Sequence, residues 1–424
     1  MKVLIVNTSE RTGGAAVAAN RLMEALNRNG EKAMMLVGKK TSDSLSVAEL
    51  RHRWYRKFLF LAERMLILLR LHGQRQHLFE IDTAEMGSDI TRTKEFRQAD
   101  IIHLHWINQG MMSLKGLQKV IGSGKPIVWT MHDAWPATAI CHYAGACKSF
   151  TTECRNCRFL PHGGSAKDVA NTVWRRKKQV LDNHNITFVA CSRWLEQQAR
   201  KSSLLQSHTV MSIPNCIDTH VFSKQDKAKA REILRLPADK QLLLFAAQRV
   251  DDERKGMRYL FEAIDIAVRN HPEWKERLGI ILLGGQNSEL VDSLPLPVYP
   301  MGFVSDETTI VNVYNASDAF IIPSLEDNLP NTIMEAMACG VPCVGFKTGG
   351  IPEMIDHKQN GYIAEQRNAD DLAAGIEWVL DENRTATLGI EASKKVATSY
   401  SQDRIALRYI NAYQEAAAYK NYRL

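Results

Sequence analysis

Several signals are missing from this sequence, and each absence excludes a class of protein. Residues 1–7 form an apolar, strand-like run without a cleavage pattern, so we expect no signal peptide and a cytoplasmic protein. The apolar run within residues 51–75 is only about a dozen residues long and is broken by Glu63 and Arg64, which is too short for a membrane span. No nucleic-acid module accompanies the net charge of +7, and we expect no nucleic-acid partner.

A dinucleotide fingerprint is also absent. Residues 7–14 read Asn-Thr-Ser-Glu-Arg-Thr-Gly-Gly and lack the Gly-x-Gly-x-x-Gly pattern, which argues against a dinucleotide-dependent oxidoreductase. The length of 424 residues favours two to three domains. Apolar runs alternate with amphipathic helical stretches, which predicts α/β domains with parallel sheets in both halves. The expected strands are 101–105, 126–131, 186–190, 242–246, 279–284, 318–322 and 342–346.

Two carboxylates, Asp327 and Glu335, flank the start of a short predicted helix. Pro330 suits a first helical turn and Gly340 suits the residue just past a helix end, so we expect a helix over 330–339. Backbone N–H groups at a helix start can bind a phosphate, and carboxylates can accept hydrogen bonds from sugar hydroxyls. Together they predict a nucleotide-sugar site, with the phosphate at Asn328, Leu329, Pro330, Asn331 and Thr332.

This segment resembles the donor-site signature of family-4 retaining glycosyltransferases, which have the GT-B fold. The family pattern is Glu, seven residues, Glu, and then Ala-Met-Ala-x-Gly-x-Pro; here Asp327 stands where the first Glu is usual. Glu326 is an alternative in a shifted register. The resemblance implies two Rossmann-like parallel-sheet domains facing a central cleft. We expect an acceptor-side domain at 1–210, a donor domain at 211–400, and a C-terminal helix, 401–424, that packs back across the cleft.

Other positions follow the family order along nearly the whole chain. Gly13-Gly14 opens a helix after the first strand, and His132 follows the apolar run 127–129. Arg249 and Lys255 resemble the basic pair that the family directs at the donor diphosphate, and Val304 lies in a loop that resembles the one holding the base. Residues 213–218 resemble a Pro-Asn-Gly-x-Asp segment, with Cys in place of Gly.

The resemblance implies a role for each of these residues. His132, Asp327 and Glu335 would be catalytic, and no catalytic metal would be needed. The implied reaction moves a sugar, with retention, from a nucleotide-diphosphate donor to a glycan or lipid-linked acceptor in bacterial surface polysaccharide synthesis. We expect UDP as the donor nucleotide first and GDP second. An inactive scaffold that binds glycan or membrane, and a sugar phosphorylase or epimerase, remain as alternatives. Donor-binding residues would be Gly13, Gly14, Arg249, Lys255, Val304, Asn328, Leu329, Pro330, Asn331, Thr332 and Glu335.

The positive charge concentrates in residues 51–75, where aromatic and aliphatic residues lie between arginines. This composition is typical of a helix that lies on an anionic membrane surface, which would make the protein peripheral on the inner face of the membrane. The alternative is a core helix with a basic outer face, since arginines commonly extend around buried helices.

Four cysteines, Cys141, Cys147, Cys154 and Cys157, crowd into an insertion over residues 141–162. In a chain without a secretory signal, clustered thiols favour a metal over disulfides, and we expect a structural zinc, with His142 or His162 as replacement ligands. Unligated thiols and disulfides remain as alternatives. In either case the insertion would brace the loop that carries His132.

Overall fold

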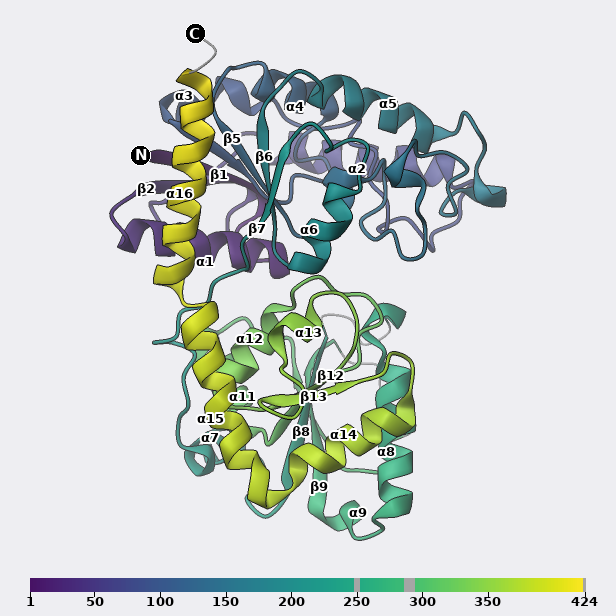
Figure 1. Ribbon diagram of the computed structural model, residues 1–424, viewed down its shortest axis with the longest axis vertical. Helices are drawn as coiled ribbons and strands as arrows, with labels where there is room; N and C mark the ends of the chain where they lie inside the picture. Colours follow the sequence, from purple (N-terminus) through teal and green to yellow (C-terminus); the bar gives the residue numbers. More distant parts are fainter. Residues whose placement is uncertain (248–251, 286–293, 422–424) are drawn as a thin grey trace. The chain divides into compact units, whose positions relative to one another are not determined.

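The computed structural model describes residues 1–247, 252–285 and 294–421, and the chain forms two compact units (Figure 1). The first unit comprises Met1–Cys216 together with Asp403–Leu424. The second unit comprises Ile217–Gln402. The C-terminal segment therefore returns to the unit in which the chain begins.

The first unit is built on a seven-stranded sheet in the order β3-β2-β1-β4-β5-β6-β7. All neighbouring strands of this sheet pair in parallel, so their carboxyl ends meet at one edge, where α/β proteins commonly bind ligands. The strands are β1 (Lys2–Ser9), β2 (Lys32–Lys39), β3 (Val47–Glu49), β4 (Ile101–Leu104), β5 (Ile127–Met131), β6 (Ile186–Ala190) and β7 (Thr209–Ser212).

Alternate residues of β1 enter two different cores, as the period of two in a strand requires. Leu4 and Val6 join one buried cluster, whereas Val3 and Ile5 join another that includes Tyr413 of the C-terminal helix. Helices thus cover both faces of the sheet. They are α1 (Gly14–Arg28), α2 (Arg53–Arg70), α3 (Lys94–Gln98), α4 (Leu114–Ile121), α5 (Val169–Leu181), α6 (Arg193–Arg200) and α16 (Gln402–Asn421).

The second unit contains a six-stranded parallel sheet in the order β10-β9-β8-β11-β12-β13. Its apolar core on one face packs between the sheet and helices α8 and α14. The strands are β8 (Gln241–Ala247), β9 (Leu278–Gly284), β10 (Val298–Gly302), β11 (Ala319–Ile322), β12 (Cys343–Phe346) and β13 (Gly361–Ala364). The described helices are α7 (Lys227–Leu234), α8 (Met257–Asn270), α9 (Trp274–Arg277), α11 (Glu307–Ala316), α12 (Asn331–Ala338), α13 (Ile351–Met354), α14 (Ala369–Leu380) and α15 (Glu382–Ser399).

The helix predicted around the two carboxylates is present as α12. Pro330 occupies the position before its first residue, and Gly340 follows its end with φ +74°, a conformation that glycine adopts without strain. None of the helices described by the structure is both long and apolar enough to cross a bilayer.

Candidate donor site and the loop around His132

The loop between β11 and α12 brings Asp327 against a lysine from a distant segment. Lys255 Nζ lies 2.7 Å from Asp327 Oδ2, and Ser324 Oγ is 3.4 Å from the same oxygen. Asp327 is buried, whereas Lys255 keeps about a quarter of its side chain exposed. The structure therefore brings together one expected catalytic acid and one expected diphosphate ligand in a single ion pair.

Two glycines allow the loops of this site to approach so closely. Gly256 has φ +69°, and a Cβ there would lie 1.9 Å from the carbonyl oxygen of Pro323. Gly349 has φ +54°, and a Cβ there would lie 1.6 Å from the carbonyl oxygen of Asp327. Any side chain at either position would push the loops apart, so these glycines are required for the contact between Lys255 and Asp327.

Glu335 lies one turn into α12 and is buried, as is Asn328 before the helix. Its Oε2 accepts a hydrogen bond of 2.8 Å from the Tyr314 hydroxyl. The loop before the helix is held by Gly350, whose N–H donates to the carbonyl of Asn328 at 2.8 Å. Leu329 and Pro330 are buried, whereas Asn331 and Thr332 are partly exposed in the first turn.

The remaining donor-site candidates lie on loops at strand ends. Val304 is partly exposed between β10 and α11. Gly13, with φ +89°, precedes α1, and Gly14 is the first residue of that helix. Arg249 lies outside the described residues.

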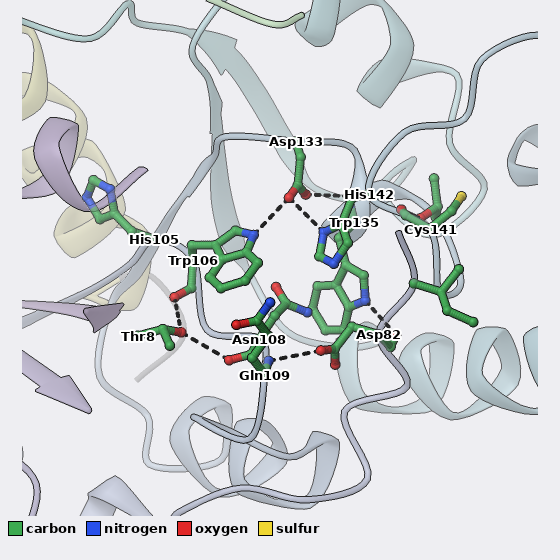
Figure 2. A network of polar contacts seen from close by, with 12 residues as sticks. Thr8, Asp82, His105, Trp106, Asn108, Gln109, Asp133, Trp135, Cys141 and His142 are labelled. Atoms are coloured by element: carbon green, nitrogen blue, oxygen red, sulfur yellow. Dashed lines mark hydrogen bonds and ion pairs between the residues drawn. The ribbon is translucent and has the colours of Figure 1, made fainter. Parts of the chain in front are cut away.

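In the first unit, Asp133 organises the loop that follows β5 (Figure 2). Its Oδ2 accepts hydrogen bonds of 2.8 Å from Trp106 Nε1 and from His142 Nδ1, and its Oδ1 accepts one from the Trp135 N–H at 2.8 Å. Burial raises the pKa of Asp133, but the contact with His142 and the other hydrogen bonds outweigh it and hold the pKa below its ordinary value. Asp133 is thus an ionised carboxylate with a structural role, and its hydrogen bonds fix the backbone directly after His132.

The His132 ring is held on both of its nitrogen atoms. Nε2 is 2.9 Å from Nδ1 of His105, and Nδ1 is 3.6 Å from Sγ of Cys191. Burial lowers the pKa of His132 to about 4, against the opposing influence of Asp133, and it lowers the pKa of His105 well below its ordinary value. Both imidazoles are therefore neutral near pH 7.

Two family profiles match the chain, and their matched ranges include the residues of both sites. The profile described as Glycosyltransferase Family 4 matches residues 12–221, and the profile described as Glycosyl transferases group 1 matches residues 240–382. The chain belongs to glycosyltransferase family 4. This glycosyltransferase takes its sugar from a nucleotide-sugar donor, and enzymes of the family typically work without a metal.

Full-length similarities agree with this assignment. An uncharacterized glycosyltransferase of Methanocaldococcus jannaschii is 25% identical, over 80% of this chain and 90% of that protein. The putative colanic acid biosynthesis glycosyl transferase WcaC of Escherichia coli is 22% identical, over 98% of this chain and 100% of that protein. The crystal structure of Anabaena HepE in complex with UDP-glucose superposes with a TM-score of 0.63 at 16% identity, covering 98% of this chain and all of that one. That likeness shows the GT-B fold.

The structure does not support the expectation of structural zinc in this glycosyltransferase. Within residues 1–247, 252–285 and 294–421, no group of three or more His, Cys, Asp or Glu residues is placed to hold a metal ion. Cys141, Cys147, Cys154 and Cys157 are free thiols. Burial raises the pKa of Cys141 to about 12 and those of Cys154 and Cys157 to about 11, and the neighbouring thiols of the cluster raise them further.

The cysteine-rich insertion does brace the His132 loop. The Ala134 N–H donates to the carbonyl of His142 at 2.8 Å, and the His142 ring donates to Asp133. Lys177 of α5 adds hydrogen bonds to the carbonyls of Trp135 and Thr138 at 2.6 and 3.0 Å. These contacts hold the loop in place.

Helix α2 of the glycosyltransferase buries two of its charged residues and exposes a row of apolar ones. Glu63 and Arg64 are buried: Arg64 pairs with Asp82 at 2.5 Å, and Glu63 accepts from the Thr83 hydroxyl at 2.8 Å. Leu59 and Ile67 of the same helix are also buried, and Arg53 and Lys57 are exposed, so a core helix with a basic outer face stays an alternative interpretation. The α2 stripe consists of apolar side chains that are each more than half exposed: Trp54, Tyr55, Phe58, Leu61, Met65 and Leu69.

Two residues at these sites escaped prediction from the sequence. Tyr314 lies in an ordinary amphipathic helix, where nothing in the sequence marks its hydroxyl as a partner of Glu335. His105 follows β4 closely, as His132 follows β5. Because these are neighbouring parallel strands, their carboxyl ends lie side by side, and that register was a signal that could have identified the pair.

Proposed function

We propose that the enzyme transfers a sugar, with retention at the anomeric carbon, from a UDP-sugar to a hydroxyl of a glycan or lipid-linked saccharide. The proposed setting is bacterial surface polysaccharide synthesis. The choice of UDP over GDP is supported by HepE, which was solved with UDP-glucose, and the setting is supported by WcaC, which is named for colanic acid biosynthesis.

The observation that carries the proposal is the ion pair of Lys255 with Asp327 beside the start of α12. The departing diphosphate concentrates negative charge, and a cation near oriented N–H groups stabilises such charge without a metal. We assign this task to Lys255 and the first turn of α12, with Arg249 as a second cation. The second unit is accordingly the donor domain.

The acids and His132 complete the assignment. Glu335 holds the hydroxyls of the ribose, and Asp327 holds those of the donor sugar, because ionised carboxylates accept hydrogen bonds in pairs. Asp327 is one methylene shorter than the Glu usual at this position, so it reaches a different distance toward the sugar. His132 is the proposed catalytic group of the first unit, which is the acceptor-side domain, and it acts on a sugar hydroxyl or its proton.

A thermal-shift panel with UDP, GDP, ADP, their sugar conjugates and NAD tests the nucleotide. A ligand that binds only the folded protein raises the melting temperature by mass action. We expect a shift with UDP and none with NAD. A shift with GDP alone would mean that the donor base is guanine and not uracil. No shift with any nucleoside diphosphate would contradict the proposal. Proton NMR of the first product formed gives the anomeric configuration, and inversion would contradict retention.

We further propose that the α2 stripe binds an anionic membrane surface, which would bring the enzyme to a lipid-linked acceptor. Trp54, Phe58, Leu61 and Met65 recur at helical spacing and form one apolar face. Arg53 and Lys57 on the same helix are exposed, and such cations complement anionic headgroups. The enzyme would then be a peripheral protein on the inner face of the membrane.

A further inference from the structure

Tyr314 is a completely buried tyrosine of the second unit whose hydroxyl donates a hydrogen bond to Glu335. It lies on α11, and its hydroxyl is 2.8 Å from Oε2 of Glu335. The phenol is the donor of this hydrogen bond, and the carboxylate oxygen accepts it. A hydrogen bond to a charged group contributes more than one between neutral groups.

The phenol ring cannot move easily to another position. It packs edge-on against Phe320 of β11, with the ring centroids 6.2 Å apart and the planes at 82°. The next residue, Asn315, holds α11 in place by accepting from the Gln225 N–H at 2.6 Å and donating to the Ser223 carbonyl at 3.1 Å. The hydroxyl of Tyr314 is therefore presented to Glu335 by a rigid support.

A carboxylate recognises two neighbouring hydroxyls only when its plane is fixed. The terminal torsion of a glutamate is broad, so a free carboxylate rotates over a wide range. A donor that binds one oxygen removes this freedom before the ligand arrives, and such preorganisation raises affinity without adding a contact to the ligand. Neither hydroxyl of a ribose would then have to orient the acid itself.

We propose that Tyr314 is a positioning residue that fixes the Glu335 carboxylate for recognition of the ribose hydroxyls of the donor nucleotide. The inference rests on the proposed function, in which Glu335 holds the ribose. Helix α11 also begins at Glu307, directly after the loop of Val304 that we assign to the base. One short element therefore supports the recognition of both the base and the sugar of the nucleoside.

The test is Tyr314→Phe, which removes a single oxygen and keeps the ring against Phe320. The dissociation constants of UDP and 2′-deoxy-UDP are measured by calorimetry, together with KM and kcat for the UDP-sugar. We expect the dissociation constant of UDP to rise about tenfold, as the loss of a hydrogen bond to a charged group predicts, and that of 2′-deoxy-UDP to rise much less. KM should rise more than kcat falls.

Tyr362→Phe is the matched control, because the Tyr362 hydroxyl also donates to a carboxylate, that of Asp371, at 2.8 Å. The Tyr362→Phe variant should leave the ratio of the dissociation constants of UDP and 2′-deoxy-UDP unchanged. An equal loss for both nucleotides in Tyr314→Phe would indicate a merely structural role and overturn the inference, as would unchanged binding. Glu335→Ala, measured in parallel, separates the positioning role of Tyr314 from the ribose-binding role of Glu335. If this variant still binds UDP more tightly than 2′-deoxy-UDP by the full wild-type ratio, the assignment of Glu335 itself fails.

Discussion

Lys255 and Asp327 are 72 residues apart in the sequence, and their side chains meet at 2.7 Å in the second unit. The lysine is thus held in position by a counter-ion before any ligand binds. A donor diphosphate would meet a cation that is already oriented and only partly exposed, which reduces the entropic cost of ordering it. The pair links the expected diphosphate ligand to the acid expected to hold the sugar.

Lys255→Ala should weaken the binding of UDP by about tenfold or more and leave the binding of uridine nearly unchanged, because the lysine recognises the diphosphate charge. Calorimetry with both ligands measures this. Lys347→Ala is the matched control, since Lys347 also pairs with a carboxylate, Glu365, at 3.1 Å in the same unit. Equal losses for UDP and uridine would contradict the assigned role.

Asp327→Glu should restore the reach that is usual in the family. We expect UDP affinity to change little, whereas the relative rates with different UDP-sugars should shift, because the added methylene moves the carboxylate toward the sugar. A rate panel with several UDP-sugars provides the measurement. Glu326→Gln should leave the panel unaltered; if it abolishes transfer and Asp327→Asn does not, the shifted register is the correct one.

Glu335→Ala should reduce transfer by about 100-fold or more, since in the proposed site it would remove two charge-assisted hydrogen bonds to the nucleotide. The fold should persist, which a thermal melt checks. Near-normal turnover in a folded variant would eliminate Glu335 from the donor site.

Acid should destabilise the first unit through its buried histidines. Burial lowers the pKa of His103 to about 3, with a contribution from His132, and burial lowers the pKa of His208 to about 4. In the unfolded chain these groups titrate near 6.5, so the unfolded state binds more protons and stability falls as the pH drops below that value. Each group contributes a slope of about 1.4 kcal/mol per pH unit.

Urea denaturation between pH 7 and pH 4.5 measures this slope. His208→Phe should make the dependence shallower, because the Phe side chain cannot take up a proton and His208 already packs against the ring of Phe188. His72→Gln, at an exposed histidine of the first unit, should leave the slope unchanged. A His208→Phe variant with an unaltered slope would contradict the origin assigned to it.

Vesicle sedimentation tests the α2 stripe. Trp54→Ser with Phe58→Ser should release the enzyme from vesicles, and Arg53→Gln with Lys57→Gln should weaken binding to anionic vesicles by about tenfold or more, at about 1 kcal/mol per cation. UDP affinity should not change in either variant. Ile390→Ser, at an exposed apolar residue of the second unit, is the control. Unchanged vesicle binding in both double variants would exclude the stripe as the membrane contact.

Much of the secondary structure, and the local geometry of the candidate donor site, followed from local sequence. The start and end of α12 follow from Pro330 and Gly340, whose backbone preferences act within one residue of the helix. The spacing of Asp327 and Glu335 follows from the same short segment. Tyr314 and His105 could not be identified in this way, because their partners lie on other elements and are brought near only by packing.

The cysteine insertion shows the opposite outcome. The spacing of four thiols favoured zinc, but a spacing fixes only the order of potential ligands along the chain, whereas a metal needs their side chains to converge. In the structure the loop is held instead by the His142 to Asp133 contact and by Lys177. The sequence identified which segment supports the His132 loop, and packing determined that hydrogen bonds provide the support.

The sequence by itself determined that α2 is amphipathic and basic, because periodicity is a local property of the chain. It could not determine which face points outward. That depended on Asp82 and Thr83, which lie beyond the helix and satisfy Arg64 and Glu63 in the interior. A buried charge is tolerated only with such partners, so the tertiary structure decided that Glu63 and Arg64 face inward and that the stripe of Trp54 and Phe58 faces solvent.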